Sequence, residues 1–306
     1  MNRTTFNKSV VPGLFALMNV AYEPKNSQAL WKEFVSTKTS RRAYEESAYY
    51  GALGIIPNKA EGAAIAYDDF VQGPTKRWTH KTYGLGVKIT EELIEDSLYP
   101  EVPTEMKQFS EELGSSARET MEILGHDIIN NGTNTTTHTD GLALAVFSSA
   151  KPTLRSSTWT NLLAPAADLS ATSLQASLDS FENTRDDSGK IQIIKASKII
   201  VAPANAWKAK ELLHSGYDPE SANNSINALK ERNLQLVVSP YLTDTDAFTL
   251  YATPPNSNAG VICFLRRKVS FAQDGDFETG DARFKTTFRH SLEVNKLNNM
   301  FHSAGA

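Results

Sequence analysis

The residues best suited to catalysis in this 306-residue sequence are six histidines and one cysteine. A helical zinc site needs two histidines four residues apart, and no pair has that spacing. His126 lies at the end of a predicted helix, where an imidazole suits the helix dipole, and His290 shares a face with apolar strand residues. Cys263 lies in an apolar run and has no disulfide partner. We therefore expect buried, structural roles for these side chains and no cofactor.

The motifs for nucleotide binding and hydrolysis are incomplete. Residues 188–190 read Ser-Gly-Lys, but Thr184 replaces the upstream glycine of a Walker A motif and Ile191 follows the lysine. The sequence also contains no Gly-x-Ser-x-Gly elbow, so a hydrolase triad has no evident nucleophile. These failures predict a protein that is not an enzyme.

One acidic loop, residues 274–281, has oxygen ligands that suit calcium. Its candidate ligands are Asp274, Asp276 and Glu278, but their spacing does not match the twelve-residue loop of an EF-hand. A polar turn before the last strand explains the same residues more simply. We therefore expect no metal, with calcium as the alternative.

Composition narrows the possible partners. The chain has 40% hydrophobic and 22% charged residues, which is typical of a globular protein with a real core. No segment approaches the roughly 18 consecutive apolar residues of a membrane span. The formal charge is −4 and no Lys/Arg-rich block appears, so the sequence lacks the basic surface of a dedicated DNA-binding protein.

The longest predicted element is a helix over residues 104–130. Pro103 and Glu105 suit its first turn, and residues 130–132, Asn-Asn-Gly, predict a left-handed stop. Its apolar residues recur at steps of three or four, which places them on one stripe. They are Met106, Phe109, Leu113, Ala117, Met121, Leu124 and Ile128.

A glycine-rich β region precedes this helix. Residues 63–71 and 75–89 read as strands joined across Gln-Gly-Pro at 72–74, which predicts a long projecting hairpin. Charges gather near its tip: Asp68 and Asp69 on one strand, Lys76, Arg77 and Lys81 on the other. They either pair across the hairpin or contact a neighbouring copy of the chain, and both interpretations remain open.

A mixed α/β region follows the helix, so the predicted class is α+β. We expect helices near 173–184 and 204–213, strands near 199–202, 234–238, 248–252 and 260–271, and a last strand with strict alternation over 284–294. Taken alone, residues 198–238 could form an α/β ligand-binding or enzymatic domain, although they lack a phosphate loop.

Three stretches carry a resemblance to a known family. Residues 82–97 (TYGLGVKITEELIEDS) run from a strand into a short acidic helix, residues 126–133 (HDIINNGT) end the long helix, and residues 141–142 (Gly-Leu) open the next region. In this order they resemble the major capsid protein of tailed bacteriophages, which has the Hong Kong 97-like fold. Within that family the sequence is most similar to the Mu-like major head subunits.

The resemblance implies an N-terminal arm (1–47), an extended loop (48–90), a peripheral domain (91–137 and 266–306) with spine helix 104–130, and an axial domain (138–265). It also implies self-assembly into pentamers and hexamers around double-stranded DNA, with scaffold and portal proteins as partners. The expected location is the virion capsid, assembled in the cytoplasm of a bacterial host. An encapsulin-like compartment shell is the alternative.

Two groups of residues gain roles from this resemblance. Trp78 and Tyr83, with the charges of the hairpin tip, are expected to contact neighbouring subunits. Gly114, Ser115 and Gly125 interrupt the spine helix at a cost of about 0.5 to 1 kcal/mol per glycine, and Gly/Ser pairs permit bending. We expect a hinge near Gly114 that bends in the immature shell and straightens in the mature one.

Overall fold

The computed structural model describes residues 14, 16–23, 29–90, 92, 102–135, 144–155, 158–217, 226–254, 259–276 and 278–306. The chain divides into two compact units. The first comprises Met1–Tyr44, Thr79–Gly125 and Cys263–Leu292, and the second comprises Glu45–Trp78, His126–Ile262 and Glu293–Ala306. Among the described residues, no helix is both long and apolar enough to cross a membrane.

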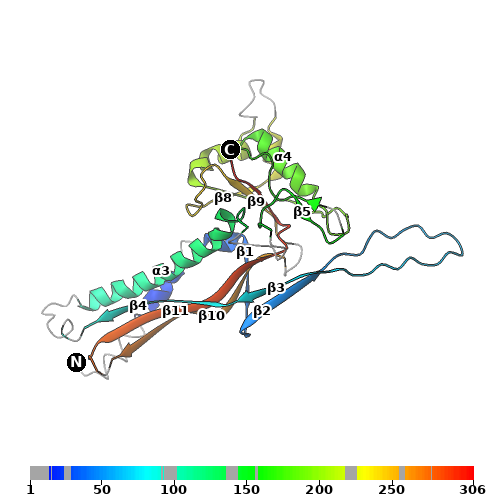
Figure 1. Ribbon diagram of the computed structural model, residues 1–306. Helices are drawn as coiled ribbons and strands as arrows, with labels where there is room; N and C mark the ends of the chain where they lie inside the picture. Colours follow the sequence, from blue (N-terminus) through cyan, green and yellow to red (C-terminus); the bar gives the residue numbers. More distant parts are fainter. Residues whose placement is uncertain are drawn as a thin grey trace. The chain divides into compact units, whose positions relative to one another are not determined.

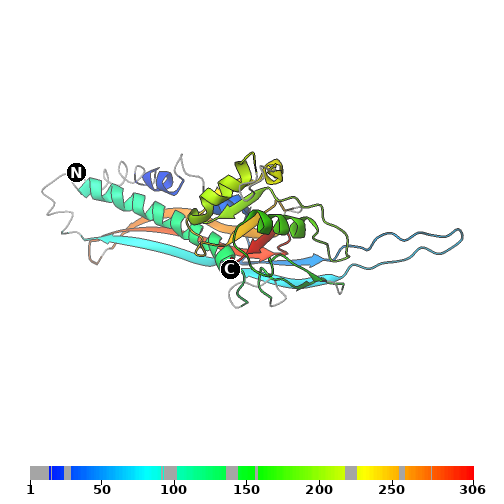
Figure 2. The same cartoon turned by 90° about the horizontal axis from the view of Figure 1, so that it is seen from above.

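The first unit is built on a four-stranded sheet in the order β1-β10-β11-β4. These strands are β1 (Val35–Thr39), β10 (Gly260–Gly275), β11 (Ala282–Asn295) and β4 (Lys81–Ile89). Figures 1 and 2 show helix α3 (Val102–Asn130) running along one face of this sheet. Leu113 of the helix packs there with Phe271 and Phe284. Leu113 and the partly buried Phe109, two residues of the apolar stripe predicted from the sequence, therefore contribute to this core.

The observed α3 confirms the predicted long helix, but its C-terminus differs in detail. Gly132 does not adopt a positive φ, so the left-handed stop predicted there is wrong. A Cβ atom at Gly132 would lie 2.4 Å from both the Ile128 carbonyl oxygen and a ring carbon of Phe147. Close packing of Phe147 therefore requires this glycine. The predicted short acidic helix, residues 91–96, lies outside the described residues except for Glu92.

The second unit contains a four-stranded sheet in the order β12-β9-β7-β8. Strands β7 (Lys198–Val201) and β8 (Gln235–Val238) are parallel, and α5 (Ala206–His214) lies between them in sequence. Residues of α5, of α4 (Ala171–Glu182) and of the sheet share one apolar cluster. The predicted helices and strands of this region are present within a few residues of their expected bounds.

The final strand of that sheet was not predicted. β12 (Met300–Ser303) pairs with β9 (Phe248–Tyr251), and all four of its residues are buried. The sequence of β12 does not read as a buried strand, because two of its four side chains are polar. Those two are satisfied locally: His302 Nδ1 lies 2.9 Å from Thr249 Oγ1, and Ser303 Oγ donates to the Ala167 carbonyl at 2.7 Å. These C-terminal residues, expected in the peripheral domain, therefore join the sheet of the second unit.

The predicted hairpin over residues 63–89 is wrong in its pairing. The turn residues 72–74 lie inside strand β3 (Gln72–Thr79), which pairs with β2 (Tyr44–Tyr50), while β4 pairs with β11. Residues 51–71 form a long exposed loop without strand structure. Alternating β-formers suggested strands here, but a strand also needs a continuous hydrogen-bonding partner, which this loop lacks along most of its length.

Candidate assembly interface

Residues 51–71 are the part of the expected extended loop (48–90) that has no strand structure, and the name extended loop is used for them from here on. This loop exposes an unusual number of large apolar side chains. Tyr67 is 95% exposed and Ile56 is 91% exposed. Large apolar side chains gathered in this way mark a surface that another molecule covers. The exposed apolar residues of the loop and its flanks are Tyr50, Leu53, Ile55, Ile56, Ile65, Tyr67, Phe70 and Val71.

The base of the extended loop is held by polar contacts within the chain. The Gly51 N–H donates to the Val71 carbonyl at 2.7 Å, and the Gly54 N–H donates to Asp68 Oδ2 at 2.7 Å. Arg155 reaches the loop from outside, with Nη1 at 2.9 Å from Asp68 Oδ1. The Gly54 N–H and the Arg155 guanidinium lower the pKa of Asp68. This carboxylate is therefore bound within its own subunit.

Lys76 and Arg77, two further charges of the predicted tip, also have partners in the chain. Lys76 Nζ lies 3.0 Å from Glu293 Oε2. Arg77 Nε lies 2.6 Å from Glu46 Oε1, and β2 and β3, which carry these residues, are paired strands. One of the two open interpretations was that Lys76 and Arg77 pair with Asp68 and Asp69. This interpretation is wrong, because their partners are Glu293 and Glu46.

The two aromatic residues expected at the interface differ in exposure. Trp78 is only 2% exposed in the single chain, so its expected burial against a neighbour is corrected to burial in its own subunit. Tyr83 is partly exposed and stacks on Phe288 and His290, with ring centroids 5.3 and 5.0 Å apart. Tyr83 and the exposed Lys81 keep a surface available for contact.

The glycines of the proposed hinge lie under close contacts in the first unit. A Cβ atom at Gly114 would lie 2.4 Å from the Met18 carbonyl oxygen, and one at Gly125 would lie 2.5 Å from the Trp31 Cβ atom. Ser115 Oγ donates to the Glu112 carbonyl at 3.0 Å. Close packing of the N-terminal segments thus explains both glycines in this structure, and the hinge stays a prediction.

A buried carboxylate anchors one of those segments. Glu122 is 4% exposed, and its two oxygens accept the backbone N–H groups of Leu30 and Trp31 at 2.8 and 2.9 Å. Both residues belong to the 3-10 helix η1 (Leu30–Glu33). Burial raises the pKa of Glu122, while these two N–H groups oppose that rise. The pair of bonds attaches the start of η1 to α3.

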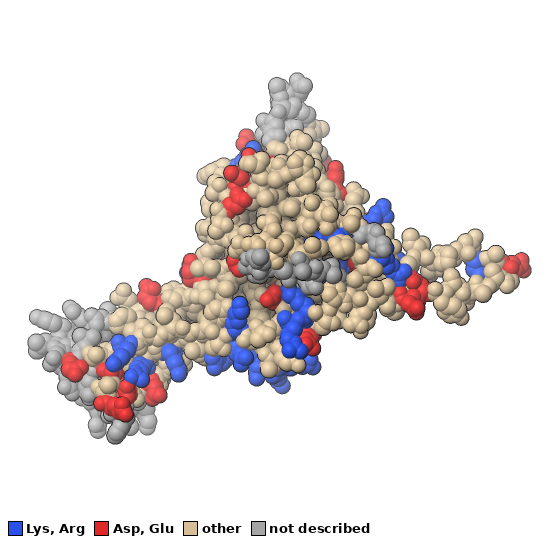
Figure 3. Space-filling model, in the orientation of Figure 1, with Lys and Arg blue, Asp and Glu red and all other residues tan. Residues whose placement is uncertain are grey.

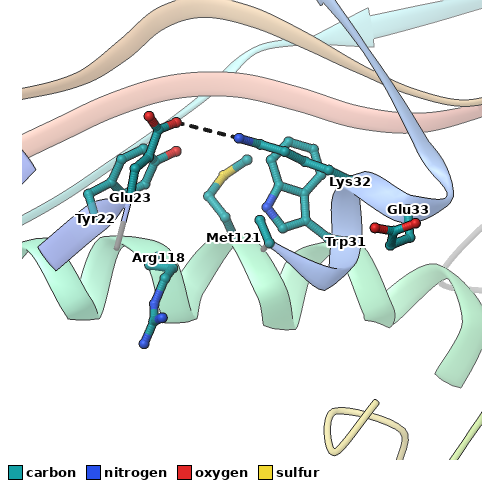
Figure 4. Close-up of a pocket in the computed structure, with 8 residues that line it drawn as sticks. Tyr22, Glu23, Trp31, Lys32, Glu33, Arg118 and Met121 are labelled. Carbon is teal, nitrogen blue, oxygen red and sulfur yellow. Dashed lines mark hydrogen bonds and ion pairs between the residues drawn. The ribbon is translucent and has the colours of Figure 1, made fainter. Parts of the chain in front are cut away.

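A cavity of about 320 Å³ lies beside this anchor, between η1, residues 22–23 and α3 (Figure 4). Trp31 and Met121 give it an apolar wall, and Lys32 Nζ lies 3.4 Å from Glu23 Oε1 across it. Burial raises the pKa of Tyr22 to about 12, so this phenol stays protonated. The lining residues include no nucleophile paired with a base, so the cavity lacks the arrangement of a hydrolytic site.

Two carboxylates of the acidic loop considered for calcium are held in ion pairs. Asp276 pairs with Arg283, and Asp281 pairs with Lys88 and accepts a hydrogen bond from Thr279. Hydrogen bonds, from the Glu278 N–H to Asp276 and from Lys88 to Asp281, are the main causes that lower the pKa of both aspartates, and the nearby cations add to the effect. In the part of the chain that the structure describes, no three metal-binding side chains gather. The geometry favours the interpretation as a polar turn, in which the Gly275 N–H donates to Asp274 Oδ1 and the Glu278 N–H donates to Asp276 Oδ1.

The cysteine and two of the histidines highlighted by the sequence lie in the core. Cys263 is fully buried, which raises the pKa of its thiol to about 12 and confirms the predicted structural role. His126 is fully buried as well, and its Nε2 lies 2.8 Å from Ser239 Oγ. His290 is 2% exposed, and burial lowers its pKa to about 4.

A basic cluster was missed by sequence reasoning. The Ser40 N–H donates to the Leu265 carbonyl at 2.9 Å, which brings the turn after β1 next to the middle of β10. Figure 3 shows Lys and Arg side chains gathered in this region. Its exposed cations are Arg41, Arg42, Arg266, Arg267 and Lys268. They come from two short segments far apart in the sequence, so neither segment alone forms a Lys/Arg-rich block.

Comparison with known proteins connects these features to a family. The family model described as phage capsid protein matches residues 73–292, which is more than half of the chain. Comparison with curated proteins finds no match.

Solved shell proteins share the fold. The capsid of cyanophage P-SCSP1u has a TM-score of 0.57 at 11% identity, covering 89% of this chain and 86% of that one. A chain of Mycobacterium phage Che8 has a TM-score of 0.53 at 14% identity, covering 93% and 94%. An encapsulin complex from Synechococcus elongatus has a TM-score of 0.53 at 12% identity, covering 91% and 87%.

The match over most of the sequence and the shared architecture agree with the resemblance of residues 82–97 and 126–133. The chain has the Hong Kong 97-like fold and belongs to the phage capsid protein family.

Proposed function

We propose that this major capsid subunit assembles through its extended loop, which lies over a neighbouring subunit in the shell. The observation that carries the proposal is the exposure of eight large apolar side chains on the loop and its flanks. Such a surface is costly in a free monomer and becomes favourable once a second copy covers it. Lys81 and Tyr83 remain candidate contacts, whereas Asp68, Asp69, Lys76 and Arg77 act first within the subunit.

The resemblance supports further parts of this proposal. We propose that the shell encloses double-stranded DNA, that scaffold and portal proteins guide its assembly, and that assembly takes place in the host cytoplasm. The chain would act without catalysis or a cofactor. The first unit would be the peripheral domain and the α/β part of the second unit the axial domain. Membership of the Mu-like branch is part of the same proposal.

Electron microscopy of the expressed full-length chain tests the central claim. Wild-type protein should form closed shells. The double substitution Ile56→Ser with Tyr67→Ser should leave a folded subunit that does not form them, because both side chains are more than 90% exposed in the single chain. Ala60→Ser in the same loop is the matched control. Normal shells from the double variant would remove the loop from the interface.

The contents of particles isolated from the natural source distinguish a virus from an encapsulin-like compartment. The family match favours nuclease-protected double-stranded DNA. An enclosed enzyme without DNA would favour the compartment instead, and would leave the assembly role of the extended loop untouched.

A further inference from the structure

Arg155 joins the two sides of the extended loop from a separate part of the second unit. It lies in the turn between β5 (Lys151–Pro152) and β6 (Thr158–Trp159). Its Nη1 pairs with Asp68 Oδ1 at 2.9 Å, and its Nη2 donates to the Asp69 carbonyl at 2.7 Å. Asp68 in turn accepts the Gly54 N–H from the opposite side of the loop. The guanidinium therefore ties one side of the loop to a third segment, and the Asp68 carboxylate that it binds also holds the other side through the Gly54 N–H.

Leu154, the residue before Arg155, also packs against the extended loop. A Cβ atom at Gly51 would lie 3.3 Å from Leu154 Cδ1, so the turn that carries Arg155 packs closely against the start of the loop. The planar guanidinium fork binds two acceptors in a fixed geometry, which a flexible ammonium group cannot reproduce. These contacts restrict the direction in which the loop leaves its base.

The loop needs such a restraint because it has little internal structure. Described cross-loop hydrogen bonds occur at Gly51–Val71 and Gly54–Asp68, near its base. An isolated pair of extended segments is marginal in water, and ordering it costs conformational entropy. A loop already fixed in direction before assembly would have less freedom to lose when it meets a neighbour.

The exposure of the Arg155–Asp68 ion pair indicates that it contributes little to the folding stability of the subunit. The side chains of Arg155 and Asp68 are 27% and 41% exposed, and exposed ion pairs contribute little to folding stability. Yet Arg155 Nε is buried and has no hydrogen-bond partner among the described residues, an arrangement that opposes stability. Orientation of the extended loop therefore explains the position of the Arg155 guanidinium better than folding stability does.

We propose that Arg155 is a positioning residue that holds the extended loop in an assembly-competent direction through Asp68 and Asp69. This inference rests on the proposed role of the loop in subunit contact. It assigns the Asp68 carboxylate and the Asp69 carbonyl to preorganisation within one subunit, and it adds a residue outside the loop to the assembly machinery.

Hydrogen exchange on the full-length, unassembled subunit tests the restraint directly. Arg155→Ala should raise exchange of the Gly51 and Gly54 amides, which donate across the base of the loop, by about fivefold, the factor that corresponds to an exposed ion pair near the upper end of its range. The melting temperature should remain close to that of the wild type. In an assembly assay the same variant should leave more protein as free subunits. Arg155→Lys should restore part of both properties, because it keeps the charge and loses the fork.

Arg232→Ala is the matched control. Arg232 forms an ion pair with Glu182 at 2.7 Å, with side chains 42% and 30% exposed, but it lies away from the extended loop in sequence. It should change neither loop exchange nor assembly. Unchanged exchange and assembly in Arg155→Ala would overturn the inference even if Ile56→Ser with Tyr67→Ser still blocks shells. Shells that form despite the loop substitutions would instead overturn the proposed function.

Discussion

His290 is buried in a stack of aromatic rings that disfavours its charged form. Its ring lies 5.0 Å from Tyr83 and 5.4 Å from Phe288 between ring centroids, and its Nδ1 has no hydrogen-bond partner among the described residues. Burial, with a smaller effect of His80, lowers its pKa to about 4. The neutral ring therefore acts as a core side chain, as its place on an alternating strand predicted.

Replacing this ring by phenylalanine should reduce the acid sensitivity of the subunit. In the unfolded chain a histidine gains its proton near pH 6.5, whereas His290 in the folded chain remains neutral down to about pH 4. The free energy of unfolding is therefore unaffected by His290 above pH 6.5. It falls by about 3 kcal/mol as the pH drops toward 4, because the unfolded chain binds a proton that the folded chain does not. His290→Phe should remove this loss, which urea unfolding at pH 7 and pH 4.5 would measure.

Another buried histidine, His302, provides a comparison. Burial also lowers the pKa of His302 to about 4, but its Nδ1 has Thr249 Oγ1 as a partner. His302→Phe should therefore destabilise the subunit at pH 7, while His290→Phe should not. An unchanged pH dependence in His290→Phe would show that His290 is not a source of the acid sensitivity.

At the scale of the element, helix α3 shows what periodicity can and cannot predict. Its length and apolar stripe follow from local sequence, and both are observed. The reason for its glycines depends on segments nearly a hundred residues away, since Trp31 packs against Gly125. A glycine in a helix can mean a bend or a close contact, and only the neighbouring segment distinguishes the two.

Gly125→Ala should destabilise the first unit even though alanine favours a helix by about 1 kcal/mol. The new methyl group would lie 2.5 Å from the Trp31 Cβ atom, and Trp31 is 2% exposed, so η1 must move. We expect a net loss of about 1 to 3 kcal/mol in the free energy of unfolding, measured with urea. Gly216→Ala is the control, because an added Cβ there has no neighbour within 4 Å. Equal stability of the two variants would refute the packing argument.

The strands divide in the same way. β10 and β11 are long and strongly patterned, so their existence was predictable. β1, β2 and β12 were missed because each is defined mainly by its partner strand, and partner choice is non-local. The assembly residues follow this rule too. Asp68 and Asp69 were visible in the sequence, but Arg155, which binds the Asp68 carboxylate and the Asp69 carbonyl, lies 86 residues from Asp69.

At the scale of the whole molecule, large apolar side chains of the second unit are exposed outside the extended loop as well. In the α/β part, Ile193 is 90% exposed, and Trp207 and Ile226 are each 80% exposed. A ring of identical subunits requires two different, complementary surfaces on each copy. Apolar side chains exposed in two separate parts of the chain supply material for two such surfaces.

We therefore expect the double substitution Ile193→Ser with Trp207→Ser to impair shell closure while the subunit remains folded. Exposed positions of this kind change folding stability by about 0.5 kcal/mol or less, so the free subunit should melt close to the wild type. Loss of apolar area between copies should instead leave small oligomers, which sedimentation and electron microscopy would detect. Lys208→Ser, an exposed neighbour on α5, is the control. Closed shells at wild-type yield from the double variant would mean that these side chains face solvent in the assembly, and the ring contact would have to lie elsewhere.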